Sequence, residues 1–152
     1  MTAIESLLKE NLLFKDIEDK YIKEIAQCTS EVQYAAGEFI FHEGEDALNL
    51  NIIRQGKVAI EVFAPKQGAV TIETIGRNEI LGWSWFIPPY RRQFDAQAIE
   101  ITRVLSIEAE CLRSICGKDP ALGYSLMQKL VQVIVERLQA TRLQLMDIYR
   151  LQ

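Results

Sequence analysis

Between Thr29 and Ile107 the chain is a succession of short segments in which apolar and polar residues alternate. Val58, Ile60 and Val62 show the alternation most clearly. A period of two residues is that of a strand with one buried face. Short strands separated by turns at spacings of about 8–12 residues are typical of all-β barrels, sandwiches and rolls. The sequence therefore predicts a β-roll over residues 29–107.

Helical patterns flank the predicted roll on both sides. Residues 2–11 form one expected helix, which Thr2 caps together with Glu5 in a capping box. Residues 16–27 form a second, and residues 108–116 a short helix that Gly117 is expected to end. The predicted fold is mainly β with flanking helices, a jelly-roll-like double-stranded β-helix. We expect one domain with three parts: N-terminal helices (1–28), β-roll (29–107) and C-terminal helices (108–152).

The last helix is expected to run from Pro120 to about Tyr149, with Asp119 as its cap. A heptad seam follows it, with spacings that alternate between three and four residues. The seam consists of Val131, Ile134, Leu138, Thr141, Leu145 and Ile148. A helix of roughly 30 residues is about 45 Å long, more than a small roll can cover. We expect a twofold homodimer through the five apolar seam residues; the alternative is that the seam packs back on the roll.

Charge and hydropathy limit the possible partners. The formal net charge is −4, which argues against a large nucleic-acid surface, although a small anion site needs only one or two arginines. The sequence contains no run of 18 apolar residues and no signal-peptide pattern at its start. We therefore expect no membrane segment and a cytoplasmic location.

The cysteines and the histidine suggest no metal site. Cys28, Cys111 and Cys116 are odd in number and lack CxxC spacing, which favours reduced thiols in a reducing compartment over a disulfide framework. His42 is the one histidine, so no obvious metal cage can form. No Ser/His/Asp set or carboxylate pair occurs at catalytic spacing, and the chain is not expected to be an enzyme.

Residues 79–98 depart from the alternation. This stretch holds both tryptophans of the chain, the Pro88-Pro89 and Arg91-Arg92 pairs, and Gly82 just before the aromatic residues. Large aromatic and guanidinium groups are rarely exposed together without a reason. We interpret the stretch as a ligand-facing insert of the roll.

Two further motifs suggest a family. Gly37-Glu38-Phe39-Ile40 followed by Glu43-Gly44-Glu45 is similar to a G-x-x-I-x-x-E-G-E corner, and residues 52–58 are similar to an I-x-x-G-x-V hairpin. With the order of elements, residues 14–145 resemble the cyclic nucleotide-binding domain of the Crp/Fnr regulator family. The resemblance implies an eight-stranded roll, a ligand insert between the sixth and seventh strands, and a long dimerising helix.

The resemblance also assigns roles within the insert. The family's cassette reads approximately F-G-E-L-A-L-L and then P-R-A-A; its glutamate accepts a hydrogen bond from the ribose, while its arginine and backbone N–H groups hold the cyclic phosphate. Here Gly82 matches, Trp83 stands at the glutamate position, and Arg92 falls at the arginine position. The resemblance thus implies that the part of the site that binds the phosphate is retained. The ribose acceptor is lost, because an indole N–H only donates.

Six ligand-binding residues are expected on this basis: Gly82, Trp83, Ser84, Arg91, Arg92 and Thr141. For Arg92 the hypotheses are a clamp on a phosphate or carboxylate, or a solvated surface residue. Arg91 would point to the opposite face of a strand-like segment, so that one arginine of the two faces the ligand. Asp95 is a candidate ion-pair partner for either arginine.

The other candidates each have a simpler explanation. Trp83 and Trp85 could stack on a flat ligand, fill the ligand's volume, or pack against the partner's long helix. Ser84 is either part of an anion-binding nest or a helix cap. Thr141 either reaches a bound base, as a hydroxyl-bearing residue near this place does in the family, or is a tolerated polar residue of the seam.

The leading functional hypothesis is a regulatory ligand-binding (sensor) domain that acts as a dimer. Cyclic AMP and cyclic GMP are the candidate ligands implied by the resemblance, with another small anion as an alternative. Full-length regulators of the family continue into a helix-turn-helix domain after the long helix, so we expect this chain to lack its own DNA-binding domain. The competing hypothesis is a degenerate domain with a self-filled pocket that serves as a dimeric protein-interaction scaffold.

Overall fold

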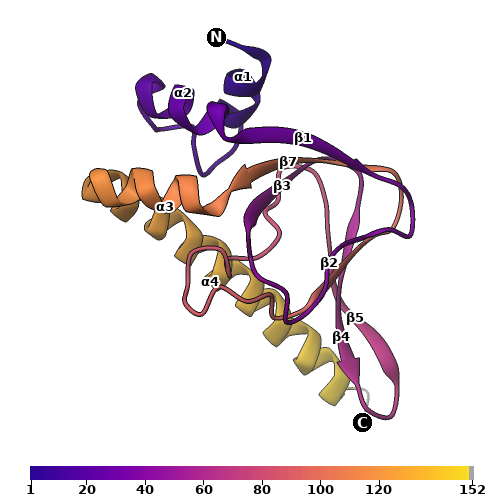
Figure 1. The fold of residues 1–152 in the computed structure, drawn as a ribbon. Coiled ribbons are helices and arrows are strands. Elements are labelled where there is room, and N and C mark those ends of the chain that lie inside the picture. The colour runs from indigo at the N-terminus through magenta and orange to yellow at the C-terminus, as the bar shows by residue number, and fades with distance from the viewer. Residues whose placement is uncertain (151–152) are drawn as a thin grey trace.

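Two antiparallel sheets and four helices make up the fold in a computed structural model that describes residues 1–150 (Figure 1). One sheet has the order β1 (Thr29–Tyr34), β7 (Thr102–Glu108) and β3 (Asn49–Gln55). The other has the order β2 (Phe39–Phe41), β6 (Asp95–Ala98), β4 (Val58–Ala64) and β5 (Gly68–Ile75). The mainly β roll with flanking helices is confirmed. Residue 152, the predicted end of the domain, lies outside the described residues.

The described residues contain seven strands, one fewer than the resemblance implies. Between strands, isolated bridges join Asp46 to Arg91 and Ile52 to Ile80. The insert lies between β5 and β6. It ends where the chain enters β6, which pairs with β2 on one side and β4 on the other. Its two ends are therefore fixed by backbone pairing, and only the middle is free to take an irregular shape.

Two groups of buried side chains fill the interior. We call the first the roll core; it consists of Phe41, Ile53, Val58, Ile60, Ile75, Leu81, Ala96 and Val104. The second, the helical core, joins the helices to the outer side of the roll and includes Leu8, Phe14, Ile25, Leu50, Trp85, Leu112 and Leu126. The helices gather on one side of the sheets (Figure 1). The insert contributes to both cores, Leu81 to one and Trp85 to the other.

The N-terminal helices follow their sequence signals with one shift. α1 (Ala3–Lys9) has the predicted capping box between Thr2 and Glu5. α2 (Asp19–Gln27) begins three residues later than predicted. The reason is that Phe14 and Ile17 are buried in a turn, closed by the Ile17 N–H donating to the Phe14 carbonyl at 3.1 Å. Burial of these two side chains thus decides where the helix can start.

The C-terminal helices are α3 (Ala109–Lys118) and α4 (Pro120–Arg150). Asp119 caps α4 as predicted, since its Oδ1 accepts from the N–H groups of Ala121 and Leu122 at 3.1 and 3.2 Å. Gly117 does not end α3 but lies inside it. The chain reverses direction instead at Asp119, whose extended backbone separates the two helices.

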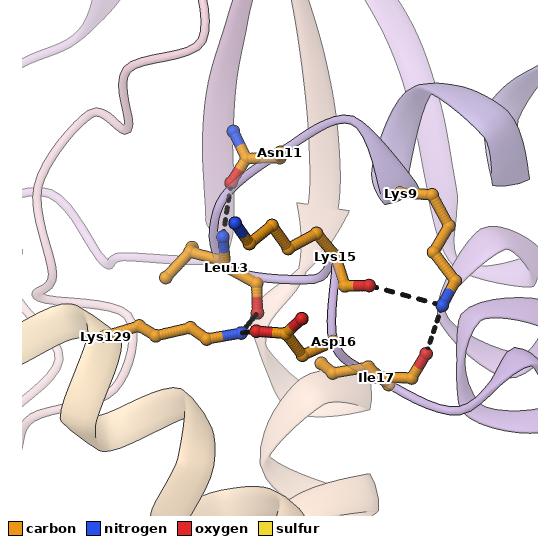
Figure 2. Close-up of polar contacts among 7 residues, drawn as sticks. All are labelled: Lys9, Asn11, Leu13, Lys15, Asp16, Ile17 and Lys129. Carbon is orange, nitrogen blue, oxygen red and sulfur yellow. Dashed lines mark hydrogen bonds and ion pairs between the residues drawn. The ribbon is translucent and has the colours of Figure 1, made fainter.

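Polar contacts hold the N-terminal segment against α4 (Figure 2). The Lys129 ammonium lies 3.3 Å from Asp16 Oδ2 and 3.5 Å from the Leu13 carbonyl. On the other side of the loop, Lys9 Nζ donates to the Ile17 carbonyl at 2.5 Å. Charged side chains at both ends of this loop therefore fix its position between α1 and α4.

The cysteine prediction was wrong. Cys28, at the end of α2, is disulfide-bonded to Cys111 in the first turn of α3, with Cα atoms 6.6 Å apart. The two residues are 83 positions apart in the sequence, so their pairing depends on the tertiary fold and not on local spacing. Cys116 is free and buried.

The far part of α4 is exposed along its whole circumference. Val131, Leu138, Leu145 and Ile148 are each at least 50% exposed, and every residue from Leu138 to Arg150 is exposed. The seam beyond Ile134 therefore does not pack back on the roll, and the homodimer stays a prediction. Among residues 1–150, none of the helices combines the length and apolarity needed to cross a bilayer.

A hydrogen bond between α2 and the α3–α4 junction predicts a pH dependence of stability. The Tyr21 hydroxyl donates to Asp119 Oδ2, and this bond is the largest cause that lowers the pKa of Asp119 below its ordinary value of 3.8. A carboxyl group whose pKa is lowered by folding stabilises the fold above its unfolded pKa, and this contribution is lost as the pH falls through the folded pKa. We expect Tyr21→Phe to lower the melting temperature near neutral pH.

The pH series supplies the control for this prediction. The difference in melting temperature between Tyr21→Phe and the unaltered chain should shrink as the pH falls below the folded pKa of Asp119, because the protonated carboxyl group has little preference for the hydroxyl donor. Thermal unfolding followed by circular dichroism at several pH values measures this. A difference that is equal at all pH values would mean that Tyr21 acts through packing alone.

Candidate anion-binding site

The insert leaves the roll at a fixed point. The Leu81 N–H donates to the Asn51 carbonyl at 2.9 Å, and the Leu81 side chain is fully buried in the roll core. Gly82 then turns the chain with φ +81°, and a Cβ at this position would lie 3.1 Å from the Phe94 ring. Positive φ and the near ring both favour glycine. Phe94 therefore lies directly beneath Gly82, near the start of the cassette.

Both indoles point toward the helices. A turn closed by the Phe86 N–H and the Trp83 carbonyl, 3.0 Å apart, carries them. Trp85 is 1% exposed within the helical core, and Arg113 donates to its carbonyl at 2.6 Å. Trp83 is half-buried against the same core, with the Arg137 guanidinium 5.6 Å from its ring centroid. The tryptophans thus pack on helices of their own chain and lie outside the roll core.

The turn also leaves backbone donors unused. Within residues 1–150, no hydrogen-bond acceptor is found for the amides of Gly82, Trp83, Ser84 and Trp85. Ser84 is buried and starts no helix, so the capping explanation for it does not apply. Successive free N–H groups at a turn form a concavity that attracts anions. These four donors are therefore the part of the cassette that suits a phosphate or carboxylate.

The arginine pair is held by strand-like pairing with the turn before β3. The Arg92 N–H donates to the Glu45 carbonyl, and the Gly44 N–H donates to the Arg92 carbonyl, both at 2.8 Å. Because successive residues of an extended segment face opposite ways, the two side chains separate. Arg91 is exposed and pairs with Asp46 at 3.3 Å, whereas Arg92 is 5% exposed.

Arg92 is a buried cation with unused donors. One nitrogen, Nη2, donates to the Asn49 carbonyl at 2.7 Å, and the guanidinium lies 4.0 Å from the centre of the Phe41 ring. Nε and Nη1 are buried without a hydrogen-bond partner among the described residues. Burial lowers the pKa of Arg92 to about 10, while the nearby Glu45 and Tyr34 act in the opposite direction. The group therefore remains charged near neutral pH, at a desolvation cost.

Two phenylalanines connect the arginine with the start of the cassette. The Phe41 ring lies under the Arg92 guanidinium, and its centroid is 5.6 Å from that of Phe94. Phe94 in turn contacts the position of Gly82. Arg92 and the cassette turn thus share one apolar floor made by these two rings. A low-polarity floor strengthens the attraction between a guanidinium group and an anion.

Asp95 is not the partner of either arginine. Its Oδ1 accepts from the Glu43 N–H at 2.7 Å and lies 3.6 Å from His42 Nδ1. Arg91 uses Asp46 instead. The hypothesis that Asp95 forms an ion pair with Arg91 or Arg92 was therefore wrong, because Asp95 at the start of β6 faces the turn at residues 42–44.

The long helix reaches the insert through a residue other than the one expected. Arg137 is 13% exposed at its side chain, donates to the Ile80 carbonyl, and lies 3.7 Å from Glu73 on β5. Thr141, one turn further along α4, is exposed and donates to the Arg137 carbonyl of its own helix at 2.9 Å. The structure therefore brings Arg137 to the cassette and leaves Thr141 outside it.

Three contributors to the site were not identified from the sequence. Asn49 contributes only a backbone carbonyl, which no side-chain pattern reveals. Phe41 looks like an ordinary strand residue, and its place under Arg92 depends on pairing between distant segments. Arg137 follows Glu136 and directly precedes the seam residue Leu138, so nothing in the sequence distinguishes it from a solvated charged residue of the helix.

Comparison with known proteins places the chain in a family. The sequence profile described as the cyclic nucleotide-binding domain matches residues 31–119, more than half of the chain. The chain belongs to the cyclic nucleotide-binding domain family. The match contains the corner, the hairpin and the whole cassette with Arg92, and it ends at the cap of α4.

Individual relatives agree with this assignment. The chain is 26% identical over 145 residues to the CRP-like cAMP-activated global transcriptional regulator of Mycobacterium tuberculosis, and spans 63% of that protein's length. A crystal structure from Geobacter metallireducens, named as a cyclic nucleotide-binding protein, has a TM-score of 0.79 and 28% identity over 91% of this chain and 99% of that one. The sensor domain of the regulator DNR from Pseudomonas aeruginosa has a TM-score of 0.75 and 18% identity, over 89% and 91% respectively.

Proposed function

We propose that this chain is a regulatory module that binds a cyclic nucleotide or another small anion at Arg92 and at the free amides of Gly82, Trp83 and Ser84. The observation that carries the proposal is the state of Arg92, 5% exposed with Nε and Nη1 buried and unpartnered. Buried donors without acceptors each cost about 1–3 kcal/mol. A guanidinium group can donate two parallel hydrogen bonds to two oxygens of one phosphate, which would supply the missing acceptors.

The ligand is expected to be held chiefly by its anionic part. Trp83 stands where the family has the ribose-binding glutamate, and its indole lies against Arg137 and the helical core. A site without that acceptor discriminates less between a ribose ligand and one that lacks the hydroxyl. Cyclic AMP is the first ligand to test, because a relative is named as cAMP-activated, and cyclic GMP and inorganic phosphate are the comparisons.

The response to the ligand is proposed to pass to α4. Arg137 joins the insert, β5 and α4 through its contacts with Ile80, Trp83 and Glu73. A ligand that shifts the insert therefore changes the support of α4, which is a shift between two populations of the same chain. We further propose that two copies pair through the exposed seam, and that residues 1–152 act as one binding domain with a regulatory rather than a catalytic role.

A dimeric scaffold with a self-filled pocket is less well supported. That function requires large side chains of the insert to occupy the space beside Arg92. Trp83 and Trp85 instead pack on the helices. The aromatic residues that do lie near the site are Phe41 and Phe94, and they form its floor, under the Arg92 guanidinium and beneath Gly82 respectively.

Titration of the intrinsic fluorescence tests the proposal, because both tryptophans lie in the insert. We expect cyclic AMP to change the emission in a saturable manner, with one site per chain by calorimetry. A ligand at about 100 times its dissociation constant stabilises the folded state by about 2.7 kcal/mol, so the melting temperature should rise in parallel. Unchanged emission and melting temperature at millimolar cyclic AMP, cyclic GMP and phosphate would refute the proposed site.

A further inference from the structure

The Cys28–Cys111 bond joins the two ends of the β-roll. Cys28 is the last residue before β1, and Cys111 follows the end of β7 by three positions. The covalent loop therefore encloses all seven strands and the insert. Outside the loop lie α1 and α2 on one side, and most of α3 with α4 on the other. The bond thus sits where the helical segments meet the roll.

The fold brings these two sulfurs together without help from the bond. The Glu108 N–H donates to the Cys28 carbonyl at 3.0 Å, and Thr29 is paired with Ile107 in the β1–β7 ladder. Two side-chain contacts, Tyr21 with Asp119 and Asp16 with Lys129, hold the same segments further out. Reduced cysteines would therefore remain neighbours in a folded chain, which is the condition for re-forming the bond.

The pair is accessible, whereas the third cysteine is not. Cys28 and Cys111 are both half-buried, so a small thiol can reach the bond. Once reduced, the Cys28 thiol has an acceptor ready in the Ile25 carbonyl, 3.3 Å from Sγ. Cys116 is buried in the helical core, and burial raises the pKa of its thiol. A thiol with a raised pKa is a poor attacking group, so exchange with Cys116 does not compete.

We propose that Cys28 and Cys111 form a reversible redox site that clasps the end of α2 to the start of α3. In the reduction, one thiol of a small dithiol attacks the Cys28–Cys111 bond and forms a mixed disulfide, which the second thiol of the same molecule then attacks. The protein's S–S bond breaks, the reductant's sulfurs form a disulfide of their own, and two protons end on Cys28 and Cys111. In the oxidation, a small disulfide such as oxidised glutathione accepts the two electrons and leaves as two thiols.

Reduction is expected to loosen the helical part more than the roll. With the clasp open, α3 is held by the helical core and by its link to β7, while the ladders of both sheets are untouched. The N-terminal end of α4 follows α3 directly after Asp119. The redox state would therefore set how firmly α3 and α4 are anchored, and this proposal is independent of any ligand at Arg92.

The first test counts thiols in the whole chain. Protein purified in air is unfolded and alkylated with iodoacetamide, and the number of labels is read by mass spectrometry, before and after treatment of the folded protein with dithiothreitol. We expect one label without reductant, on Cys116, and three after it. Three labels without reductant, also after incubation with oxidised glutathione, would overturn the proposal. A bond that dithiothreitol opens only in the unfolded chain would overturn its reversibility in the native state.

The second test asks where the effect lies. A disulfide that closes a loop of this length stabilises the folded state considerably. Loss of the Cys28–Cys111 bond should therefore lower the melting temperature by about 10 °C. We expect this decrease on reduction of the unaltered chain and of Cys116→Ala, and no effect of dithiothreitol on the double variant Cys28→Ser, Cys111→Ser. Hydrogen exchange should accelerate more in α2 and α3 than in the sheets, where it reports only the loss of global stability. Acceleration spread evenly over the chain would show a general staple and contradict the clasp.

Discussion

Replacing Arg92 with methionine is expected to weaken anion binding strongly without destabilising the free chain. The substitution removes the charge and all donors but keeps a side chain of similar length in the roll. Loss of one member of a buried, charge-assisted pair costs about 2–5 kcal/mol, so affinity for cyclic AMP should fall by at least about 30-fold. The free chain loses the bond to the Asn49 carbonyl but also two buried, unpartnered nitrogens, and its melting temperature should be equal or higher.

The neighbouring arginine is the matched control. Arg91 carries the same charge one residue earlier, but it is exposed and pairs with Asp46 on the surface. Exposed ion pairs contribute at most about 1 kcal/mol, so Arg91→Met should leave both affinity and stability nearly unchanged. Equal losses of affinity in the two variants would show that general positive charge, and not the buried fork of Arg92, attracts the ligand. Calorimetric titration and thermal unfolding of both variants decide this.

The second large effect is expected at the seam of α4. Leu138 is 56% exposed in the single chain, so Leu138→Asp should not disturb the fold of one copy. In the proposed twofold dimer, residue 138 of each copy is buried at the interface. An unpaired carboxylate at this position is strongly unfavourable. A cost of about 2 kcal/mol or more per copy weakens the dimer by roughly 1,000-fold. Sedimentation should therefore show dimers for the unaltered chain and monomers for the variant at micromolar concentration.

Gln139 provides the control for the seam. It is exposed and follows Leu138 directly, on the outward side of the heptad. Gln139→Asp adds the same charge to the same turn and should leave the dimer intact. If the unaltered chain sedimented as a monomer, or if both variants dissociated equally, pairing through the seam would be contradicted. Helical circular dichroism of each variant shows whether α4 itself remains formed.

The roll and the helices could be predicted because their signals are local. The apolar period of β4 and the capping residues of α1 and α4 act within a few positions, and the structure contains the strand and both caps, although Val58 to Glu61 are buried without alternation. α2 begins later than predicted because burial of Phe14 and Ile17 outweighs the helical pattern of that segment. The prediction of reduced cysteines was wrong for a long-range reason. Nothing near Cys28 in the sequence indicates Cys111 as its disulfide partner.

The candidate site likewise combines features that local sequence patterns predict with features that depend on the tertiary fold. Strand-like alternation predicts that Arg91 and Arg92 face opposite sides, and the structure places them so. The composition of the insert could not reveal that Trp83 and Trp85 turn toward the helices, because that direction is set by the core they join. Nor could it reveal that Arg137, rather than Thr141, is the residue of α4 that contacts the insert.

The central claim is that the free nitrogens of Arg92 bind the anionic part of the ligand. The most direct measurement is the ¹⁵N resonance of the Arg92 side-chain Nε–H, assigned by comparison with Arg92→Met and followed during titration with cyclic AMP. We predict that this resonance shifts with ligand and becomes protected from solvent exchange at saturation, while that of Arg91 stays in place. A ligand that binds while the Arg92 resonance remains unchanged would contradict the claim.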